Sequence, residues 1–176
     1  MTNSFLRGKS AIVTGGASGL GHEIAISLAK RGANIAIMSL SQVNPAKLAS
    51  ELKYFASTDD IENTKREIES LGVKCLIFDG DVSCQEDVLR MAETSFDEFG
   101  SVDILINNAA TNCLHKVLNH DNKTWKRVID VNLYGSYLCA REILPFMIQS
   151  NWGRIISIAS TNAHIGTAEY LSLIHI

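Results

Sequence analysis

The chain has 176 residues, 46% of them hydrophobic, and a formal net charge of -3. This length can bury one hydrophobic core but not two, so a single domain is expected. Its 16 Lys and Arg residues are interspersed with 19 Asp and Glu residues and form no basic stripe, which argues against nucleic-acid binding. No apolar segment approaches the ~18 residues of a membrane span. The four cysteines form no Cys-x-x-Cys pair and are expected to be reduced, as in a cytoplasmic protein.

Short apolar runs alternate with helical patterns along the chain. Each run is apolar on both faces, and helices separate one run from the next. This arrangement predicts a parallel sheet that is covered by helices on both faces. The predicted strands are residues 11–13, 35–38, 76–78, 104–106 and 155–158.

Capping residues predict where the helices begin and end. The helix after the first strand is expected to end at Gly32 in a left-handed cap. Ser83 with Glu86 three residues later predicts a capping box. A long helix is expected over residues 122–149, interrupted late by Pro145.

The stretch between the second and third strands is longer than a simple crossover needs. Its pattern fits two helices, or one helix with an excursion. A new start is predicted at residues 57–60, and the segment ends before Gly72. A surface insertion is favoured over a separate functional module.

A glycine-rich segment, Thr14-Gly-Gly-Ala-Ser-Gly-Leu-Gly21, follows the first strand and opens the first helix. Glycines permit a tight turn and let the backbone approach a pyrophosphate, which the helix N-terminus then holds. Three glycines in a loop often serve only a turn, but the strand before and the helix after favour a dinucleotide site. No Gly-Lys-Ser/Thr follows, which argues against a nucleoside-triphosphate loop.

Five motifs in a fixed order resemble those of the short-chain dehydrogenases/reductases, in the single-domain branch. The resemblance covers residues 6 to about 170 and implies a Rossmann-type doubly wound parallel sheet with helices on both faces. Ala110 stands where the family usually has glycine. The motifs are residues 14–21, Asp81-Val82, Asn107-Asn108-Ala109-Ala110, Asn132 within Val-Asn-Leu-Tyr-Gly, and Ser160 within Ile-Ser-Ile-Ala-Ser.

The resemblance implies which residues bind the cofactor. Asp81, after the third strand, is expected to accept a hydrogen bond from the adenine amine, and Val82 to pack on the ring. The residues expected around the pyrophosphate and the adenosine ribose are Gly15, Ser18, Gly19, Leu20 and Gly21.

Three further polar residues are implied near the reacting groups. Asn107 ends the fourth strand, where ligands approach a parallel sheet, although an Asn that satisfies strand-end backbone groups fits equally well. Asn132 is unfavourable in mid-helix, which indicates another role, such as holding a water in a proton relay. Ser160 could cap the fifth strand, but its place in the motif order favours a catalytic hydroxyl that binds the substrate oxygen.

The choice between NAD and NADP depends on the end of the second strand. NAD-preferring relatives carry an acid there, and this chain has Ser39. NADP-preferring relatives place a basic residue next to it, and this chain has Leu40. Ser18, in place of a Lys or Arg in the glycine loop, tilts the expectation to NAD.

The C-terminal part departs from the family. Relatives have a Tyr about thirteen residues after the Ser, and a Lys one turn later that lowers the pKa of this Tyr. That spacing from Ser160 falls on Leu173, while Tyr170 is three residues too early and no Lys follows it. Residues 171–176 match what CTGTCTCTTATACACATC encodes, which resembles a transposase-end adapter. We therefore expect residues 1–170 to be an incomplete Rossmann domain and residues 171–176 to be a non-native tail.

These observations predict an NAD(P)-dependent oxidoreductase that, in its full-length form, transfers hydride between a nicotinamide cofactor and an alcohol/carbonyl substrate. The present chain is expected to be inactive, with residues 154–159 as an open sheet edge. The alternative is a non-catalytic dinucleotide-binding or interaction fragment. The complete protein is expected to be a homodimer or homotetramer that pairs through the long helix. Its apolar residues Val128, Val131, Leu138 and Ile143 exceed what one sheet face needs, although core packing could also absorb them.

Overall fold

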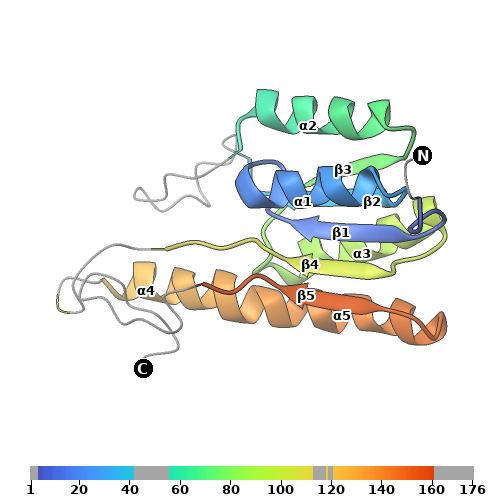
Figure 1. Ribbon diagram of the computed structural model, residues 1–176. Helices are drawn as coiled ribbons and strands as arrows, with labels where there is room; N and C mark the ends of the chain where they lie inside the picture. The colour runs from blue at the N-terminus through green and yellow to red at the C-terminus, as the bar shows by residue number, and fades with distance from the viewer. Residues whose placement is uncertain (1–3, 42–55, 113–117, 119–120, 161–176) are drawn as a thin grey trace.

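A computed structural model describes residues 4–41, 56–112, 118 and 121–160. Five strands form one sheet in the order β3-β2-β1-β4-β5, and every neighbouring pair is parallel (Figure 1). All five predicted strands are present, each with bounds within one residue of the prediction. The strands are β1 (Ser10–Thr14), β2 (Asn34–Ser39), β3 (Cys75–Asp79), β4 (Ile104–Asn107) and β5 (Arg154–Ser157).

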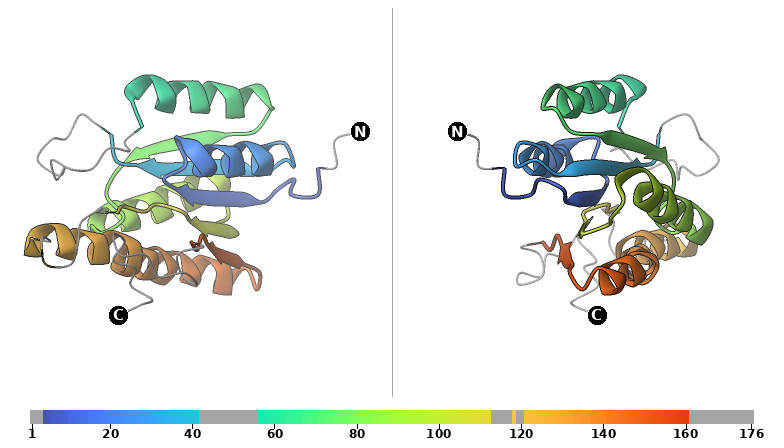
Figure 2. Two further views of the ribbon diagram at one scale, coloured as in Figure 1. Left: turned by 60° about the vertical axis from the view of Figure 1, so that its left-hand side comes forward. Right: turned by 90° about the vertical axis from the view of Figure 1, so that its right-hand side faces the viewer.

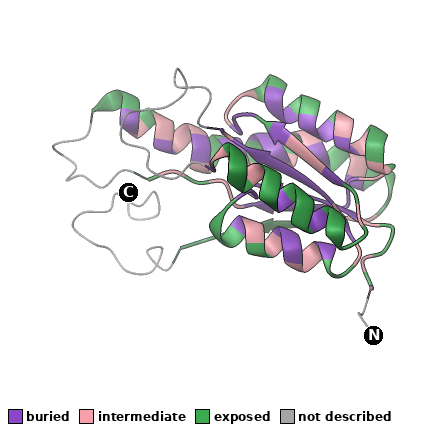
Figure 3. Ribbon diagram, turned by 90° about the horizontal axis from the view of Figure 1, so that it is seen from above, coloured by how far each residue is buried: buried purple, intermediate pink, exposed green. Residues whose placement is uncertain are grey.

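Helices cover both faces of the sheet (Figures 1 and 2). One face packs against α1 (Gly19–Ala29) and α2 (Thr58–Ser70). The other packs against α3 (Gln85–Phe99) and the long helix of α4 (Asn122–Ile129), the π-helical segment η3 (Asp130–Gly135) and α5 (Ser136–Gln149). The central strands are buried along their length, while the helices expose their outer sides (Figure 3). The predicted doubly wound α/β sheet is confirmed.

Successive residues of one strand point to opposite faces of the sheet and pack with the helices on each face. Ile12 of β1 belongs to the core under α3 and α5, and its neighbour Val13 to the core under α1 and α2. This alternation explains why the strands are apolar at consecutive positions. On the α3–α5 side, Phe96 and Phe146 stack with ring centroids 4.8 Å apart.

One predicted helix start is wrong in detail. The capping box of Ser83 and Glu86 does not form, because Ser83 donates its hydroxyl to Asp81 and the N-cap of α3 is Cys84. The left-handed cap at Gly32 after α1 is confirmed: Gly32 has a φ of 94°, its N–H donates to the Ala29 carbonyl at 2.8 Å, and the Ala33 N–H donates to the Leu28 carbonyl at 3.2 Å. The predicted new start at residues 57–60 is confirmed, since Ser57 caps α2 through a capping box. The helix expected before it lies outside the described residues.

The long helix over Asn122–Gln149 is present, but its irregularity is at Asp130–Gly135 and not at Pro145. Pro145 lies inside α5, which continues to Gln149. The backbone hydrogen bonds of a π-helical turn span one residue more than those of an α-helical turn. The extra residue rotates the side chains that follow about the helix axis. The turn contains Asn132, whose side chain bonds to a neighbouring loop.

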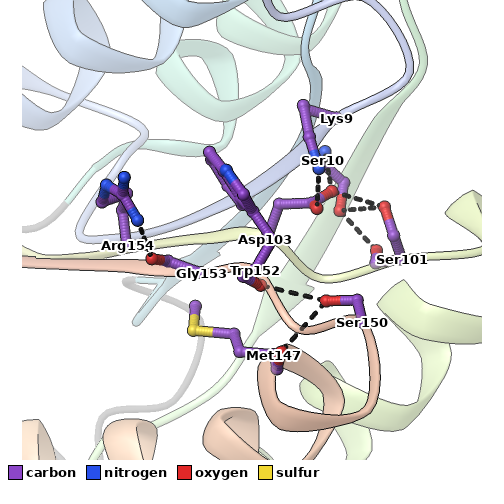
Figure 4. A network of polar contacts seen from close by, with 9 residues as sticks. All are labelled: Lys9, Ser10, Ser101, Asp103, Met147, Ser150, Trp152, Gly153 and Arg154. Carbon is purple, nitrogen blue, oxygen red and sulfur yellow. Dashed lines mark hydrogen bonds and ion pairs between the residues drawn. The ribbon is translucent and has the colours of Figure 1, made fainter.

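Asp103 fastens β1 to β4 at the amino end of the sheet (Figure 4). Its carboxylate accepts from Lys9 Nζ at 2.8 Å, from the Ser10 N–H at 2.9 Å and from Ser101 Oγ at 2.5 Å. Its side chain is 2% exposed. Lys9 Nζ also lies 4.1 Å from the ring centre of Trp152, which leads into β5. One buried acid thus joins segments that are far apart in the sequence.

Among the described residues, strand β5 lies at the edge of the sheet and is exposed along its whole length. Ile155 and Ile156 are 42% and 49% exposed. The predicted open apolar edge is therefore present. Within the part of the chain that the structure describes, no helix is both long and apolar enough to cross a bilayer.

Candidate functional site

The glycine-rich segment forms the turn between β1 and α1. Gly15 and Gly19 have φ values of 64° and 53°, a region that L side chains rarely adopt. A Cβ on Gly21 would overlap the Gly15 carbonyl oxygen and lie 2.5 Å from Asn108 Nδ2. Ser18 is the N-cap of α1, and its side chain does not bond to the helix. Gly21 therefore packs tightly within the loop, whereas a Cβ on Gly19 would meet nothing within 4 Å.

Thr14 and Asn108 hold this loop to the end of β4. Thr14 Oγ1 accepts from the Asn108 and Ala109 N–H groups, both at 3.0 Å. Asn108 Nδ2 donates to the carbonyl oxygens of Thr14 at 2.9 Å and Gly15 at 3.1 Å. The loop is thus fixed by side chains of both strands that flank it.

A cavity of about 310 Å³ lies at the carboxyl ends of the strands. Parallel α/β sheets bind ligands at this edge. It contains seven of the ten predicted site residues: Gly15, Ser18, Gly19, Leu20, Gly21, Asp81 and Val82. The other residues that line it are Met38, Ser39, Leu40, Ala56, Gly80, Asn108, Ala109, Ala110, Thr111, Asn112, Arg127 and Val131.

Asp81 lies just after β3 and is 7% exposed. Its Oδ1 accepts from the Ser83 N–H at 2.9 Å and from Ser83 Oγ at 2.7 Å, and its Oδ2 lies 2.7 Å from Arg127 Nη1. Burial alone raises the pKa of Asp81, but the Ser83 hydrogen bonds and the Arg127 guanidinium together lower that pKa below its usual 3.8. Next to it, Val82 packs against the backbone of Gly135 in η3.

Asn107 is the last residue of β4 and Asn132 lies in η3, and neither lines the cavity. Asn107 Nδ2 donates to the Ser136 carbonyl at 3.5 Å, and its buried Oδ1 has no hydrogen-bond partner among the described residues. Asn132 accepts from the Thr111 N–H at 2.8 Å and donates to the Thr111 carbonyl at 2.9 Å. Its amide therefore ties the loop after β4 to η3, and its role in a proton relay stays a prediction.

Ser160 follows β5 at the same end of the sheet, is exposed and does not line the cavity. Its catalytic role stays a prediction. Ser39, the residue that bears on the choice of cofactor, is 7% exposed, and its Oγ accepts from the Ala17 N–H at 3.3 Å. Tyr170 and the tail lie outside the described residues.

Sequence reasoning assigned no role to three polar residues of this site. Thr14 and Asn108 lie inside the quoted motifs, so their chain positions could have singled them out. Arg127 carries no local signal, because its partners Asp81 and Ser83 are distant in the sequence. No group of three or more His, Cys, Asp or Glu residues that could hold a metal occurs within the described ranges.

The strand order and the helices on both faces define a Rossmann-type fold. The sequence matches the family described as short chain dehydrogenase over residues 9–58 and 54–172. The chain belongs to this family, as its motifs predicted.

Several relatives are similar over nearly the whole chain. The uncharacterized oxidoreductase YgcW of Escherichia coli (strain K12) is 36% identical over 161 residues, which are 92% of this chain and 55% of the relative. The 3-oxoacyl-[acyl-carrier-protein] reductase FabG of Staphylococcus epidermidis is 32% identical over 158 residues, 90% of this chain and 59% of the relative.

Two solved structures share the fold. A candidate short-chain alcohol dehydrogenase from Sinorhizobium meliloti 1021 superposes with a TM-score of 0.82 at 25% identity, over 96% of this chain and 61% of that one. An NAD+-bound xylitol dehydrogenase gives a TM-score of 0.81 at 23% identity, over 97% of this chain and 60% of that one. The chain thus spans between 55% and 61% of the length of these relatives. The Rossmann domain is incomplete relative to them.

Proposed function

We propose that the chain is the cofactor-binding part of an NAD(P)-dependent oxidoreductase that, in full-length form, transfers hydride between a nicotinamide cofactor and an alcohol/carbonyl substrate. The observation that carries this proposal is the cavity at the carboxyl ends of the strands, formed by the glycine loop and the end of β3. Family membership supports the same reaction class.

The residues of the cavity fit a dinucleotide. A Cβ on Gly19 would meet nothing within 4 Å, so the start of α1 has open space beside the backbone in which a pyrophosphate could lie. The backbone of Ser18, Gly19 and Leu20 at the start of α1 presents N–H groups and the positive end of the helix dipole to an anion. Asp81 and Val82 would hold the adenine. When bound, a nicotinamide cofactor supplies or accepts the hydride.

We propose a preference for NAD over NADP. Among the described residues that line the cavity, Arg127 is the only cation, and it is paired with Asp81. No described cation therefore remains for a 2′-phosphate. Ser39, whose hydroxyl oxygen accepts from the Ala17 N–H, carries no negative charge that would repel a 2′-phosphate. We therefore expect the preference for NAD to be moderate.

The proposed catalytic residues are Ser160, which would bind the substrate oxygen, and Asn132, which would support proton transfer. The sequence offers no Tyr at the family spacing from Ser160 and no Lys one turn after Tyr170. We therefore propose that this chain binds a dinucleotide but does not turn it over, since losing a positioned proton donor costs about 10² to 10⁴ in rate. The alternative is a dinucleotide-binding or interaction module without catalysis.

The test compares residues 1–170 with the same residues followed by the natural downstream coding sequence. Both proteins are assayed for NADH and NADPH turnover with a panel of alcohols and ketones. Turnover by the longer protein alone supports the proposal. Equal turnover by both would assign the proton donor to Tyr170, and a longer protein that binds dinucleotide without turnover would favour the non-catalytic alternative.

We further propose that the complete protein is a cytoplasmic homodimer or homotetramer. The residues expected at the interface, Val128, Val131, Leu138 and Ile143, are instead in the core, because the long helix directs them at the sheet. The side chains left for association on α5 are Tyr137, Leu144 and Ile148, which are 55%, 43% and 66% exposed. An Ile148→Glu variant should dissociate in light scattering at micromolar concentration, and an unchanged molar mass would count against this face.

A further inference from the structure

An ion pair inside the cavity joins the end of β3 to α4. Arg127 Nη1 lies 2.7 Å from Asp81 Oδ2 and donates to Ser83 Oγ at 2.8 Å. The side chains of Arg127 and Asp81 are 19% and 8% exposed. Solvent screens a pair at this depth much less than it screens a surface pair.

The ion pair is the only source of charge in the described lining of the cavity. Asp81 accepts from three donors of the protein: the Ser83 N–H, the Ser83 hydroxyl and Arg127 Nη1. A carboxylate has about four acceptor positions, so these donors fix its orientation and leave room for one more. Arg127 Nε is buried and has no hydrogen-bond partner within the described part of the chain, so the guanidinium is bonded through Nη1.

We propose that Arg127 is a positioning residue for nucleobase recognition, which holds the Asp81 carboxylate so that its remaining acceptor position selects a base with an exocyclic amino group. The inference rests on the proposed function, in which Asp81 faces the adenine of a dinucleotide. Arg127 acts through Asp81 and does not itself contact the base.

The geometry of the pair explains how Arg127 affects which base Asp81 selects. Within the described residues, Arg127 Nη1 is the one donor to Asp81 Oδ2, whereas both Ser83 donors bond to Oδ1. Without Arg127, Oδ2 is no longer held in place, and the carboxylate can turn its remaining acceptor position away from an amino group on the base. A Lys in place of Arg127 keeps the charge but lacks the rigid planar fork of a guanidinium, so we expect it to restore selection in part.

The test measures the ratio of two affinities on the 176-residue chain. The probes are NADH and its analogue with hypoxanthine in place of adenine, which carries a carbonyl where adenine carries the amine. The parent should prefer NADH by about tenfold, which is the size of one hydrogen bond to a charged group. Arg127→Met should reduce this ratio to about one, and Arg127→Lys should give an intermediate ratio.

Lys126→Met is the matched control. Lys126 is the neighbour of Arg127 on α4, and its 72% exposed side chain pairs with Asp130 outside the cavity. This control removes the same charge and should keep the ratio of the parent. A purely structural role of Arg127 would lower both affinities together and leave the ratio unchanged, which would overturn the inference.

Folding of each variant is checked by circular dichroism. If Arg127→Met does not fold, the test relies on Arg127→Lys. An affinity ratio of Arg127→Lys equal to that of the parent would then overturn the inference. A parent that binds both probes equally would also overturn it while leaving dinucleotide binding intact. A parent that binds neither probe would overturn the proposed function as well.

Discussion

Gly21 is the tightest point of the glycine loop, because a Cβ there would meet the Gly15 carbonyl and the Asn108 amide. Gly21→Ala should therefore push the loop away from the end of β4. We expect a loss of about 1–3 kcal/mol in the free energy of unfolding and at least about tenfold weaker NADH binding. Thermal unfolding and isothermal titration calorimetry measure the two effects.

Gly72→Ala is the control for this substitution. Gly72 has a φ of 82° and open space around it, far from the loop, so its substitution costs backbone strain alone. That variant should lose about 1 kcal/mol of stability and keep its affinity for NADH. NADH affinity equal to the parent's in Gly21→Ala would contradict the proposed contact between loop and pyrophosphate.

The lowered pKa of Asp81 also predicts a pH dependence of stability. The pKa of this carboxylate is lower in the folded chain than its usual 3.8. Its contribution is therefore fully present above about pH 4 and is lost as the pH falls through the lower folded value. Asp81→Asn removes the titrating group, so its free energy of unfolding should fall less between pH 5 and pH 2.5 than that of the parent.

The same variant should be less stable than the parent at pH 7, by about 1–3 kcal/mol, because Arg127 loses its counter-charge. Urea unfolding across the pH range measures both effects. Ser83→Ala, which keeps the ion pair, should retain part of the acid dependence. Parallel pH profiles of the parent and Asp81→Asn would show that Asp81 has no depressed pKa.

At the scale of elements, the Asp103 network joins β1 to β4 at the end of the sheet opposite the cavity (Figure 4). Asp103→Ala leaves the buried Ser10 N–H without its acceptor and Lys9 without its counter-ion. Lys9 is about a third exposed and can be hydrated, so we expect the loss of one buried acceptor, about 1–3 kcal/mol. Urea unfolding should show this loss while the folded protein keeps its NADH affinity.

Glu69→Ala is the comparison, because the Lys65–Glu69 pair is exposed on both sides. Glu69→Ala should lower the free energy of unfolding by less than about 0.5 kcal/mol. If Asp103→Ala lowered the free energy of unfolding no more than this control, the Asp103 network would not be what holds β1 to β4.

The elements differ in how far local sequence determines them. The five strands and the glycine loop could be predicted, because apolar runs and glycine spacing are local signals. Ser83 does not cap α3 as expected, because its hydroxyl donates to Asp81 instead. The π-helical turn contains Asn132, whose partner Thr111 belongs to another segment, so no local pattern predicted this turn. The Asp81–Arg127 pair arises only once β3 and α4 are in place. Partners brought together by the fold have no signature in a single stretch of sequence.

At the scale of the whole molecule, the exposed edge of β5 should control association of the 176-residue chain. Ile156 is 49% exposed on this strand. Ile156→Lys places a charge on the edge, which opposes pairing with another strand. We expect the parent to form oligomers in light scattering at micromolar concentration and this variant to form markedly fewer.

Leu71→Lys adds the same charge at a residue that is 37% exposed and lies after α2, away from the edge. It should associate as the parent does. Equal association of all three proteins would place the contact elsewhere than on β5.

The strand order also has a consequence for synthesis on the ribosome. Strand β2 pairs with β1, β3 with β2, β4 with the free side of β1, and β5 with β4. Each strand therefore joins an edge that already exists, and none has to be inserted between two strands that are already paired. The described residues that line the cavity all lie between Gly15 and Val131, before β5 in the chain. A nascent chain can thus form this cavity before translation reaches β5, and a ligand bound there would stabilise the growing sheet.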